Sequence, residues 1–215
     1  MSGRGAGRVL SCGVGLALLA AVVASAELLD PQKGQKEGRF QRTRVGATPE
    51  EWARHLDDSR ADVRLEAVKL LAESNDPNTD EYLMQAVDNS DPRVAAAAVD
   101  ALGRLEAKDA ASFLAEHLAM AGTSAGLRPR ILVALGRIKD PKSGRDVLSF
   151  VQAESDSELE SLGIRVLGEI GDESIRADLR GLAARENNPD AKRLLEDAEA
   201  KIAARGAPTK SASPP

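Results

Sequence analysis

An all-helical solenoid is the fold class that this sequence predicts, and three observations support it. A short apolar motif recurs at spacings of 32 and 33 residues. The apolar residues around each copy follow helical spacing. Aromatic residues make up only 2% of the chain, so small aliphatic residues supply the apolar 42% and favour closely packed helices. We therefore expect an all-α fold, a right-handed α-solenoid (superhelix) of about five antiparallel helix pairs.

Residues 1–26 have the three parts of a secretory signal peptide. Residues 1–8 carry two arginines and no acid, and residues 9–23 form an apolar run. Ala24 and Ala26 then supply the small residues of a signal cleavage site. The apolar run is shorter than the roughly 20 residues that a helix needs to span a bilayer. We therefore predict an exported protein, periplasmic or secreted, with no transmembrane domain after cleavage.

The alternative is a membrane-tethered protein that keeps this segment uncleaved. Finding Glu27 as the mature N-terminus would exclude that alternative. The single cysteine, Cys12, lies inside the segment, so the cleaved chain has no disulfide, thiolate metal site or cysteine nucleophile.

Three further regions follow the predicted signal peptide. Residues 27–48 form a basic flexible linker with five basic and three acidic residues. Residues 49–204 form the repeat domain, in which 20 Lys and Arg oppose 31 Asp and Glu for a net charge of −11. Residues 205–215, rich in Pro, Ser and Ala, are predicted to be a disordered tail.

Each repeat is predicted to be a helix A followed by a helix B, and helix B shows the pattern best. Its apolar positions begin, copy by copy, at Val63, Val94, Leu127 and Leu159. Counted from that residue, positions four, five, seven and eight continue the apolar stripe, and position eleven is Ser74, Leu105, Ile138 or Ile170. Position nine is Ala72, Gly103, Gly136 or Gly168. Because glycine within a helix costs about 1 kcal/mol relative to alanine, its recurrence predicts a neighbouring helix too close for a Cβ.

The A helices and the joints between helices have signals of their own. Apolar residues mark helix A at spacings of 31 to 33 residues, namely Trp52, Leu83, Leu114, Val147 and Leu179. Capping boxes are predicted at residues 48–51 and at residues 155–158. Asp91, Asp140 and Asn188 each precede a proline and are predicted helix caps. The last helix B is diluted by charged residues, as the terminal repeat of a solenoid requires.

These repeats resemble the HEAT repeat family, particularly the short HEAT-like repeats known from phycobilisome lyases. Asp62-Val63-Arg64 and Leu167-Gly168-Glu169-Ile170-Gly171-Asp172 carry the resemblance best. The third and fourth repeats depart from it, with Leu127-Arg128 and Leu159-Glu160 in place of Val-Arg. The resemblance covers about 155 of the 215 residues. It implies an α-solenoid and says little about function, which must be argued from a site.

The sequence offers little for catalysis. His55 and His117 occupy a helix A position that is apolar in the other repeats, so we interpret them as packed or half-buried histidines rather than as ligands of one metal. The chain has no Gly-rich phosphate loop, metal-binding His-x-x-x-His or Gly-x-Ser-x-Gly motif. We predict no enzymatic activity and no cofactor. The acidic repeat domain also argues against nucleic acid as a partner.

The remaining face of helix B predicts an interaction surface. Positions six and ten lie off the apolar stripe and would line a concave wall in a HEAT-type solenoid. The charged residues at these positions are Lys69, Glu73, Asp100, Arg104, Arg137, Arg165 and Glu169. Arginine pairs readily with carboxylates, so we predict a monomeric scaffold or adaptor that binds another protein or peptide, with acidic groups.

Two alternatives to this interpretation remain open. The wall residues could form ion pairs from repeat to repeat instead of binding a partner. The chain could also be a lyase-type enzyme or enzyme activator related to the phycobilisome-lyase HEAT-like proteins, which rests on family analogy alone.

Overall fold

The computed structural model describes residues 48–74 and 76–206. Within these residues the chain forms ten α-helices, three short 3₁₀ turns and no strand. The α-helices are α3 (Pro49–Arg54), α4 (Ala61–Glu73), α5 (Thr79–Val87), α6 (Pro92–Arg104), α7 (Ala111–Ala119), α8 (Arg128–Ile138), α9 (Gly144–Ala153), α10 (Ser157–Ile170), α11 (Glu173–Arg185) and α12 (Pro189–Gly206). The 3₁₀ turns are η1 (His55–Asp57), η2 (Lys108–Ala110) and η3 (Pro141–Ser143).

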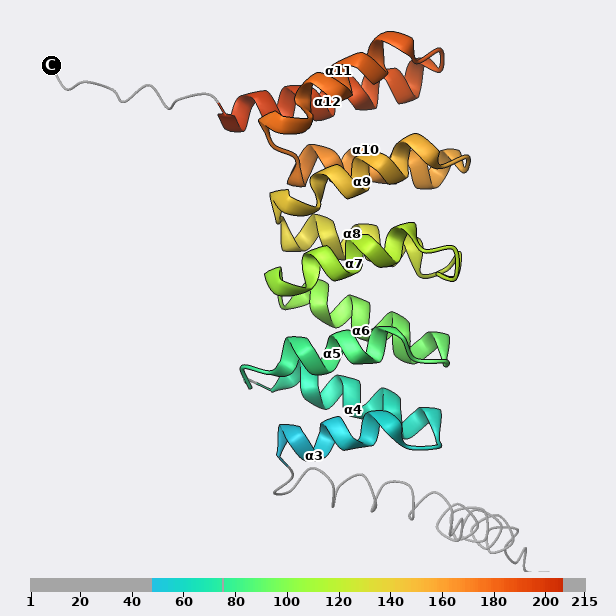
Figure 1. Ribbon diagram of the computed structural model, residues 1–215, viewed down its shortest axis with the longest axis vertical. Helices are drawn as coiled ribbons and strands as arrows, with labels where there is room; N and C mark the ends of the chain where they lie inside the picture. The colour runs from blue at the N-terminus through green and yellow to red at the C-terminus, as the bar shows by residue number, and fades with distance from the viewer. Residues whose placement is uncertain (1–47, 75, 207–215) are drawn as a thin grey trace, which may run out of the picture. The chain divides into compact units, whose positions relative to one another are not determined.

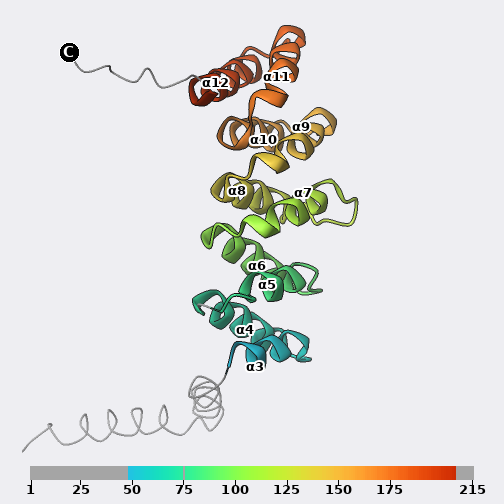
Figure 2. The same cartoon turned by 60° about the vertical axis from the view of Figure 1, so that its left-hand side comes forward.

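Consecutive helices form five pairs that stack along the chain (Figure 1), which confirms the predicted α-solenoid. Figure 2 shows the two layers, most clearly in the last three pairs, with α8, α10 and α12 on one side and α7, α9 and α11 on the other. Helices α4, α6, α8, α10 and α12 are the B helices, and each contacts the next along the stack. The right-handedness of the superhelix stays a prediction.

Most of the predicted domain boundaries cannot be compared with the fold. The signal peptide, with Ala24 and Ala26, and residues 27–47 of the linker lie outside the described residues, as do residues 207–215. Helix α12 continues to Gly206, so the first two residues of the predicted tail are helical. The guanidinium of Arg205 explains this, because it donates hydrogen bonds of 2.8 Å to the backbone carbonyls of Gly168 and Gly171.

Most of the predicted caps are present. Thr48 and Glu51 form a capping box at the start of α3. Asp91 caps α6, and the hydrogen bonds that it accepts from Arg93 lower its pKa to about 2. Asn188 accepts a hydrogen bond of 2.9 Å from the backbone of Asp190 at the start of α12. Asp140 caps the 3₁₀ turn η3 rather than an α-helix.

The capping box predicted at residues 155–158 is wrong. The N-cap of α10 is Asp156, whose carboxylate accepts hydrogen bonds from the backbone N–H groups of Glu158 and Leu159. An ionised carboxylate is the stronger acceptor at a helix N-terminus, where the helix dipole favours negative charge. The helix therefore begins one residue later than the serine-based box predicts.

The apolar stripe of helix B forms the core. Position eight is fully buried in the first four repeats, at Leu71, Leu102, Leu135 and Leu167. The stripe fails at position eleven of the second repeat, where Leu105 is 40% exposed. Helix α6 ends at Arg104, and Glu106 takes a left-handed φ of 52°. The chain turns there, and Ala107 takes the buried place with its N–H bonded to the carbonyl of Leu102.

The recurring glycines do not share one cause. A Cβ on Gly103 would lie 2.8 Å from the Cα of Ala134 on α8, closer than real Cβ atoms approach. A Cβ on Gly168 would lie 3.2 Å from the Cα of Ala198 on α12, which is tight. At Gly136 the nearest atom would be a Val166 methyl at 3.5 Å, an ordinary contact. The prediction that a neighbouring helix leaves no room for a Cβ is therefore confirmed at Gly103 and wrong at Gly136. At Gly168 a Cβ would fit only if the neighbouring helix shifted slightly.

Candidate interaction surface

Positions six and ten of the first four B helices form one row of side chains outside the core, here named the B-face. Its members are Lys69, Glu73, Asp100, Arg104, Val133, Arg137, Arg165 and Glu169, all exposed except the half-buried Asp100. The helix packing brings the B-face positions of successive B helices to the same side of the stack. Gly103 of α6 lies against Ala134 of α8, so Arg104 and Arg137 occupy the last turns of adjacent helices.

Part of the B-face is already paired. Lys69 lies 3.7 Å from Glu66 one turn earlier in α4. Asp100 pairs with Arg130 of the next B helix, and Glu169 pairs with Lys201 of α12 at 2.7 Å. The repeat-to-repeat ion pairing that the sequence left open therefore occurs at two places.

Arg130 and Lys201 were missed by the sequence prediction. Lys201 lies 32 residues after Glu169, so the repeat spacing could have found it at position ten of the last B helix. Arg130 lies at position three of its helix. No pattern across the repeats points to it, because its partner occupies a different position.

Three arginines of the B-face stay unpaired. Within residues 48–74 and 76–206, no carboxylate pairs with Arg104, Arg137 or Arg165. Arg104 and Arg137 lie in last helical turns, where the helix dipole favours positive charge. The two glutamates of the B-face do not neutralise them, since Glu169 is held by Lys201 and Glu73 forms no ion pair in the same part of the chain.

The centre of the B-face combines these arginines with an apolar side chain. Val133 is 40% exposed on α8, one turn before Arg137. Helix α8 contains three arginines and no acid, although the surrounding repeat domain is acidic. We name Arg104, Val133, Arg137 and Arg165 the central patch. Within the described part of the chain, its three guanidinium groups have no carboxylate partner, and an exposed apolar side chain lies on the same face.

The two histidines differ in their surroundings. His117 on α7 is buried, and its Nε2 lies 2.8 Å from the Asp88 carboxylate while its Nδ1 lies 3.0 Å from the Phe113 carbonyl oxygen. His55 in η1 is half-buried. The interpretation of both as packed or half-buried side chains is therefore confirmed. Among the described residues, no group of three or more His, Cys, Asp or Glu side chains could hold a metal ion.

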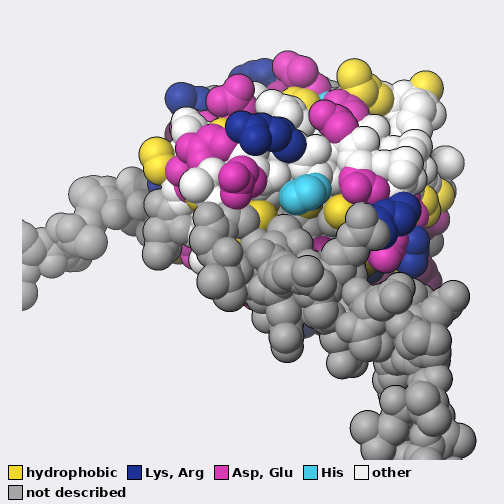
Figure 3. All heavy atoms as spheres, turned by 90° about the horizontal axis from the view of Figure 1, so that it is seen from below, with side chains coloured by type: hydrophobic (Ala, Val, Ile, Leu, Met, Phe, Trp, Pro, Cys, Tyr) yellow, Lys and Arg dark blue, Asp and Glu magenta, His cyan; other side chains and the backbone are white. Residues whose placement is uncertain are grey.

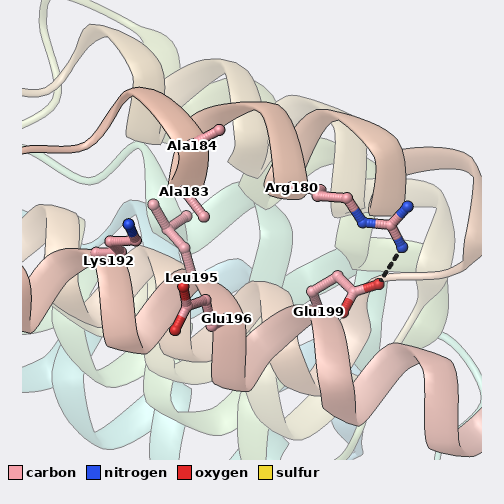
Figure 4. Close-up of a pocket in the computed structure, with 7 residues that line it drawn as sticks. All are labelled: Arg180, Ala183, Ala184, Lys192, Leu195, Glu196 and Glu199. Atoms are coloured by element: carbon pink, nitrogen blue, oxygen red, sulfur yellow. Dashed lines mark hydrogen bonds and ion pairs between the residues drawn. The ribbon is translucent and has the colours of Figure 1, made fainter.

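A groove of about 240 Å³ lies between α11 and α12. Leu195 and Ala183 lie near one another in it, Lys192 and Glu196 lie toward one end, and Arg180 pairs with Glu199 toward the other (Figure 4). This mixture of charges gives the groove no preference for one sign. At the opposite end of the stack, acidic and basic side chains also intermingle where the surface is visible (Figure 3).

Part of the repeat domain is similar to a known family. Residues 49–125 match the family model of HEAT repeats. Over these residues the chain is similar to HEAT repeats. HEAT repeats commonly serve as protein-interaction scaffolds and are typically non-enzymatic. The narrower resemblance to lyase-type repeats stays a prediction, and no curated protein matches the sequence. None of the helices in the described part of the chain could cross a membrane.

Proposed function

We propose that this HEAT-repeat protein is an exported, non-enzymatic scaffold that binds an acidic segment of a partner protein on its B-face. The observation that carries the proposal is the central patch, where an exposed valine and three arginines without an ion pair in the described residues share one face of the B helices. Charged side chains steer a partner and fix its register, while a central apolar contact supplies buried area.

The charge distribution supports an acidic partner. The repeat domain has a net charge of −11, so an acidic ligand is repelled by most of its surface. Helix α8 reverses the sign locally, and the ion pairs at Asp100 and Glu169 occupy the acidic groups on either side. An acidic segment with an apolar side chain therefore has one favourable place on the B-face.

Binding of a defined peptide tests the proposal. The probe is a fluorescein-labelled 20-residue peptide of repeated Glu-Leu-Glu-Glu units, with a Lys-Leu-Lys-Lys peptide as the opposite-charge comparison. We expect the acidic peptide to bind, and any binding of the basic peptide to the acidic surface to remain at least as strong in the variant below. The double variant Arg104→Glu and Arg137→Glu should raise its Kd by at least about tenfold in fluorescence anisotropy, because two attractive contacts become repulsive.

The matched control reverses two arginines of the A helices, Arg54→Glu and Arg145→Glu. Both are exposed and form no ion pair within the described residues, so the net charge changes equally without touching the central patch. If both double variants lost binding equally, net charge rather than the central patch would explain the loss, and the proposed site would be wrong. Failure of the wild-type protein to bind the acidic peptide would contradict the acidic-partner proposal.

Export is tested separately by the mass of the protein recovered from its native host. Cleavage after Ala26 predicts a mature chain that begins at Glu27. A recovered chain that retains residues 1–26 would instead support the membrane-tethered alternative.

A further inference from the structure

His117 joins the second and third repeats by contacts that depend on its protonation. The side chain lies in the last turns of α7, is only 8% exposed and packs against the Phe113 ring at a centroid distance of 4.2 Å. Its Nε2 reaches Asp88, which follows α5 in the preceding repeat. The ring therefore bridges the second and third repeats, which are also joined by apolar packing and by the ion pair between Asp100 and Arg130.

Both ring nitrogens face hydrogen-bond acceptors. Nδ1 lies 3.0 Å from the backbone carbonyl oxygen of Phe113, and Nε2 lies 2.8 Å from a carboxylate oxygen of Asp88. Neither a carbonyl nor an ionised carboxylate can donate a proton. A neutral imidazole carries one N–H and an imidazolium carries two. Both contacts are therefore hydrogen bonds only when His117 is positively charged.

The same turn fixes the longest joint between a helix A and a helix B. The joint spans residues 120–127, and the His117 carbonyl accepts a hydrogen bond from the Thr123 hydroxyl and one of 3.3 Å from the Met120 N–H. Arg128 reaches the Met120 carbonyl at 3.5 Å. The backbone of His117 is thus part of the hydrogen bonding at the start of this joint, and its ring contacts anchor the same turn of α7.

The helix A position that His117 occupies holds no titratable side chain in three other repeats. There it is Ala86, Phe150 or Leu182, and the first two are buried. A phenylalanine therefore fits this environment without a hydrogen-bond partner. The histidine therefore gives the junction between the second and third repeats a titratable side chain at this position, with a carboxylate in reach.

We infer that His117 is an acid-stabilised latch between the second and third repeats, and that it holds the 120–127 joint when protonated. Histidine changes charge between pH 5 and 8. Both hydrogen bonds form in the imidazolium, and one of them is lost whichever nitrogen gives up its proton. The inference concerns the stability of the junction and does not depend on the proposed binding function.

The charged groups on the elements around His117 bear on the sign of this effect. Asp88 and Asp91 lie in the joint of the second repeat, and Glu116 precedes His117 on α7. Arg128 begins α8 and pairs with Glu154 after α9 at 3.8 Å. Asp88 contacts the ring directly, whereas the positive charge of Arg128 is shared with Glu154. The carboxylate of Asp88 is therefore the charged group whose removal tests the contact directly.

Hydrogen exchange of the 118–127 amides across pH 5.5 to 8 tests the latch. After correction for intrinsic exchange rates, we expect protection at pH 5.5 to exceed that at pH 8 by on the order of tenfold, the effect of one hydrogen bond to a charged group. Side-chain ¹⁵N NMR should show His117 as the doubly protonated form at pH 5.5. The signal is assigned by its absence in His117→Phe.

Two variants should flatten the pH profile in different ways. His117→Phe copies the residue of the fourth repeat and removes the titratable group, and Asp88→Asn removes the carboxylate while keeping its size. His55→Phe is the matched control and should leave the profile of this joint unchanged. A neutral His117 ring at pH 5.5, or a wild-type profile that matches that of either latch variant, would overturn the inference.

Discussion

The middle and the C-terminal end of this solenoid are held together by different forces. Between α6 and α8 the contact is backbone against backbone, with Gly103 lying on Ala134 and fully buried leucines on both helices. Between α10 and α12 the approach at Gly168 is looser, and charged side chains join the helices. Lys201 pairs with Glu169, and Arg205 donates to two carbonyls of the α10 terminus.

This difference follows from what each repeat has to cover. A central repeat has neighbours on both sides, so small residues can bring its helices together and bury apolar area. Within the described residues no further helix pair covers α12, whose sequence is polar and whose charged side chains contact α10 at the surface. Close packing is sensitive to volume, whereas surface ion pairs are sensitive to salt and pH. The two regions should therefore fail under different perturbations.

The largest expected effect is that of Gly103→Ala. Its Cβ would lie 2.8 Å from the Cα of Ala134, so α6 and α8 must separate. We expect a loss of about 1–3 kcal/mol in the free energy of unfolding, the usual cost of overpacking, measured by urea denaturation. This loss comes despite the higher helix propensity of alanine.

Gly136→Ala is the matched comparison, because the new methyl would meet Val166 at an ordinary 3.5 Å. Helix propensity then dominates, and we expect a gain of up to about 1 kcal/mol. If the two variants shifted stability in the same direction, close approach of the backbones would not be what holds the middle of the stack together.

A smaller effect is expected at the C-terminal end from Glu199→Gln. Glu199 accepts hydrogen bonds from Arg180 and from Arg176, and these bonds hold its pKa below the usual range of a glutamate. Its stabilising contribution is therefore present at neutral pH and lost as the pH falls through that lowered pKa. The variant should lower the unfolding midpoint at pH 7, by less in high salt than in low salt, and should lose less stability than the wild type on acidification.

Glu196→Gln supplies the control on the same helix. Glu196 is exposed in the groove between α11 and α12 and forms no ion pair within the described residues. Its neutralisation should leave the midpoint and its salt dependence nearly unchanged. Equal responses of the two variants would point to the net charge of α12 rather than to the pairing of Glu199 with the two arginines.

The same contrast explains how far the sequence could predict this molecule. The buried stripe of helix B recurs with the same period as the helix pairs. Leu102 and Leu135 occupy the same position in successive repeats, so the sequence period alone predicts that both are core residues. The exception at Leu105 arises from a left-handed turn at Glu106, which is a local backbone event without a periodic signal. The buried apolar positions of helix B were therefore predictable except at Leu105, where α6 has already ended at Arg104.

The candidate surface was less predictable because ion pairs depend on side-chain reach. The B-face positions followed from helical geometry, but the pairing of Asp100 with Arg130 joins two different repeat positions and depends on how α6 and α8 are offset. The contact between His117 and Asp88 likewise crosses from one repeat to the next. Such contacts require the stacking of the helices to be known first.

The smallest expected effect concerns a ladder of contacts at the joints between helix A and helix B. The first helix B places Arg64 against Asn89 of the next joint, and the third places Arg128 near Glu154. The fourth has Glu160 at this position, and its pKa is raised by burial and by the nearby carboxylate of Glu186. A raised pKa in a carboxylic acid means that folding favours the protonated form, so this junction is least stable above that pKa and gains stability as the pH falls through it.

Glu160→Arg should restore the ladder, because the new guanidinium would meet Glu186 as Arg128 meets Glu154. A half-exposed ion pair of this kind contributes roughly 0.5 kcal/mol, visible as a small rise of the unfolding midpoint at pH 7. Glu160→Gln separates the two causes, since it removes the repulsion without adding a pair and should give part of the gain. If the arginine variant were no more stable than the glutamine variant, the ladder would not extend to the last junction, and relief of carboxylate repulsion would account for the whole effect.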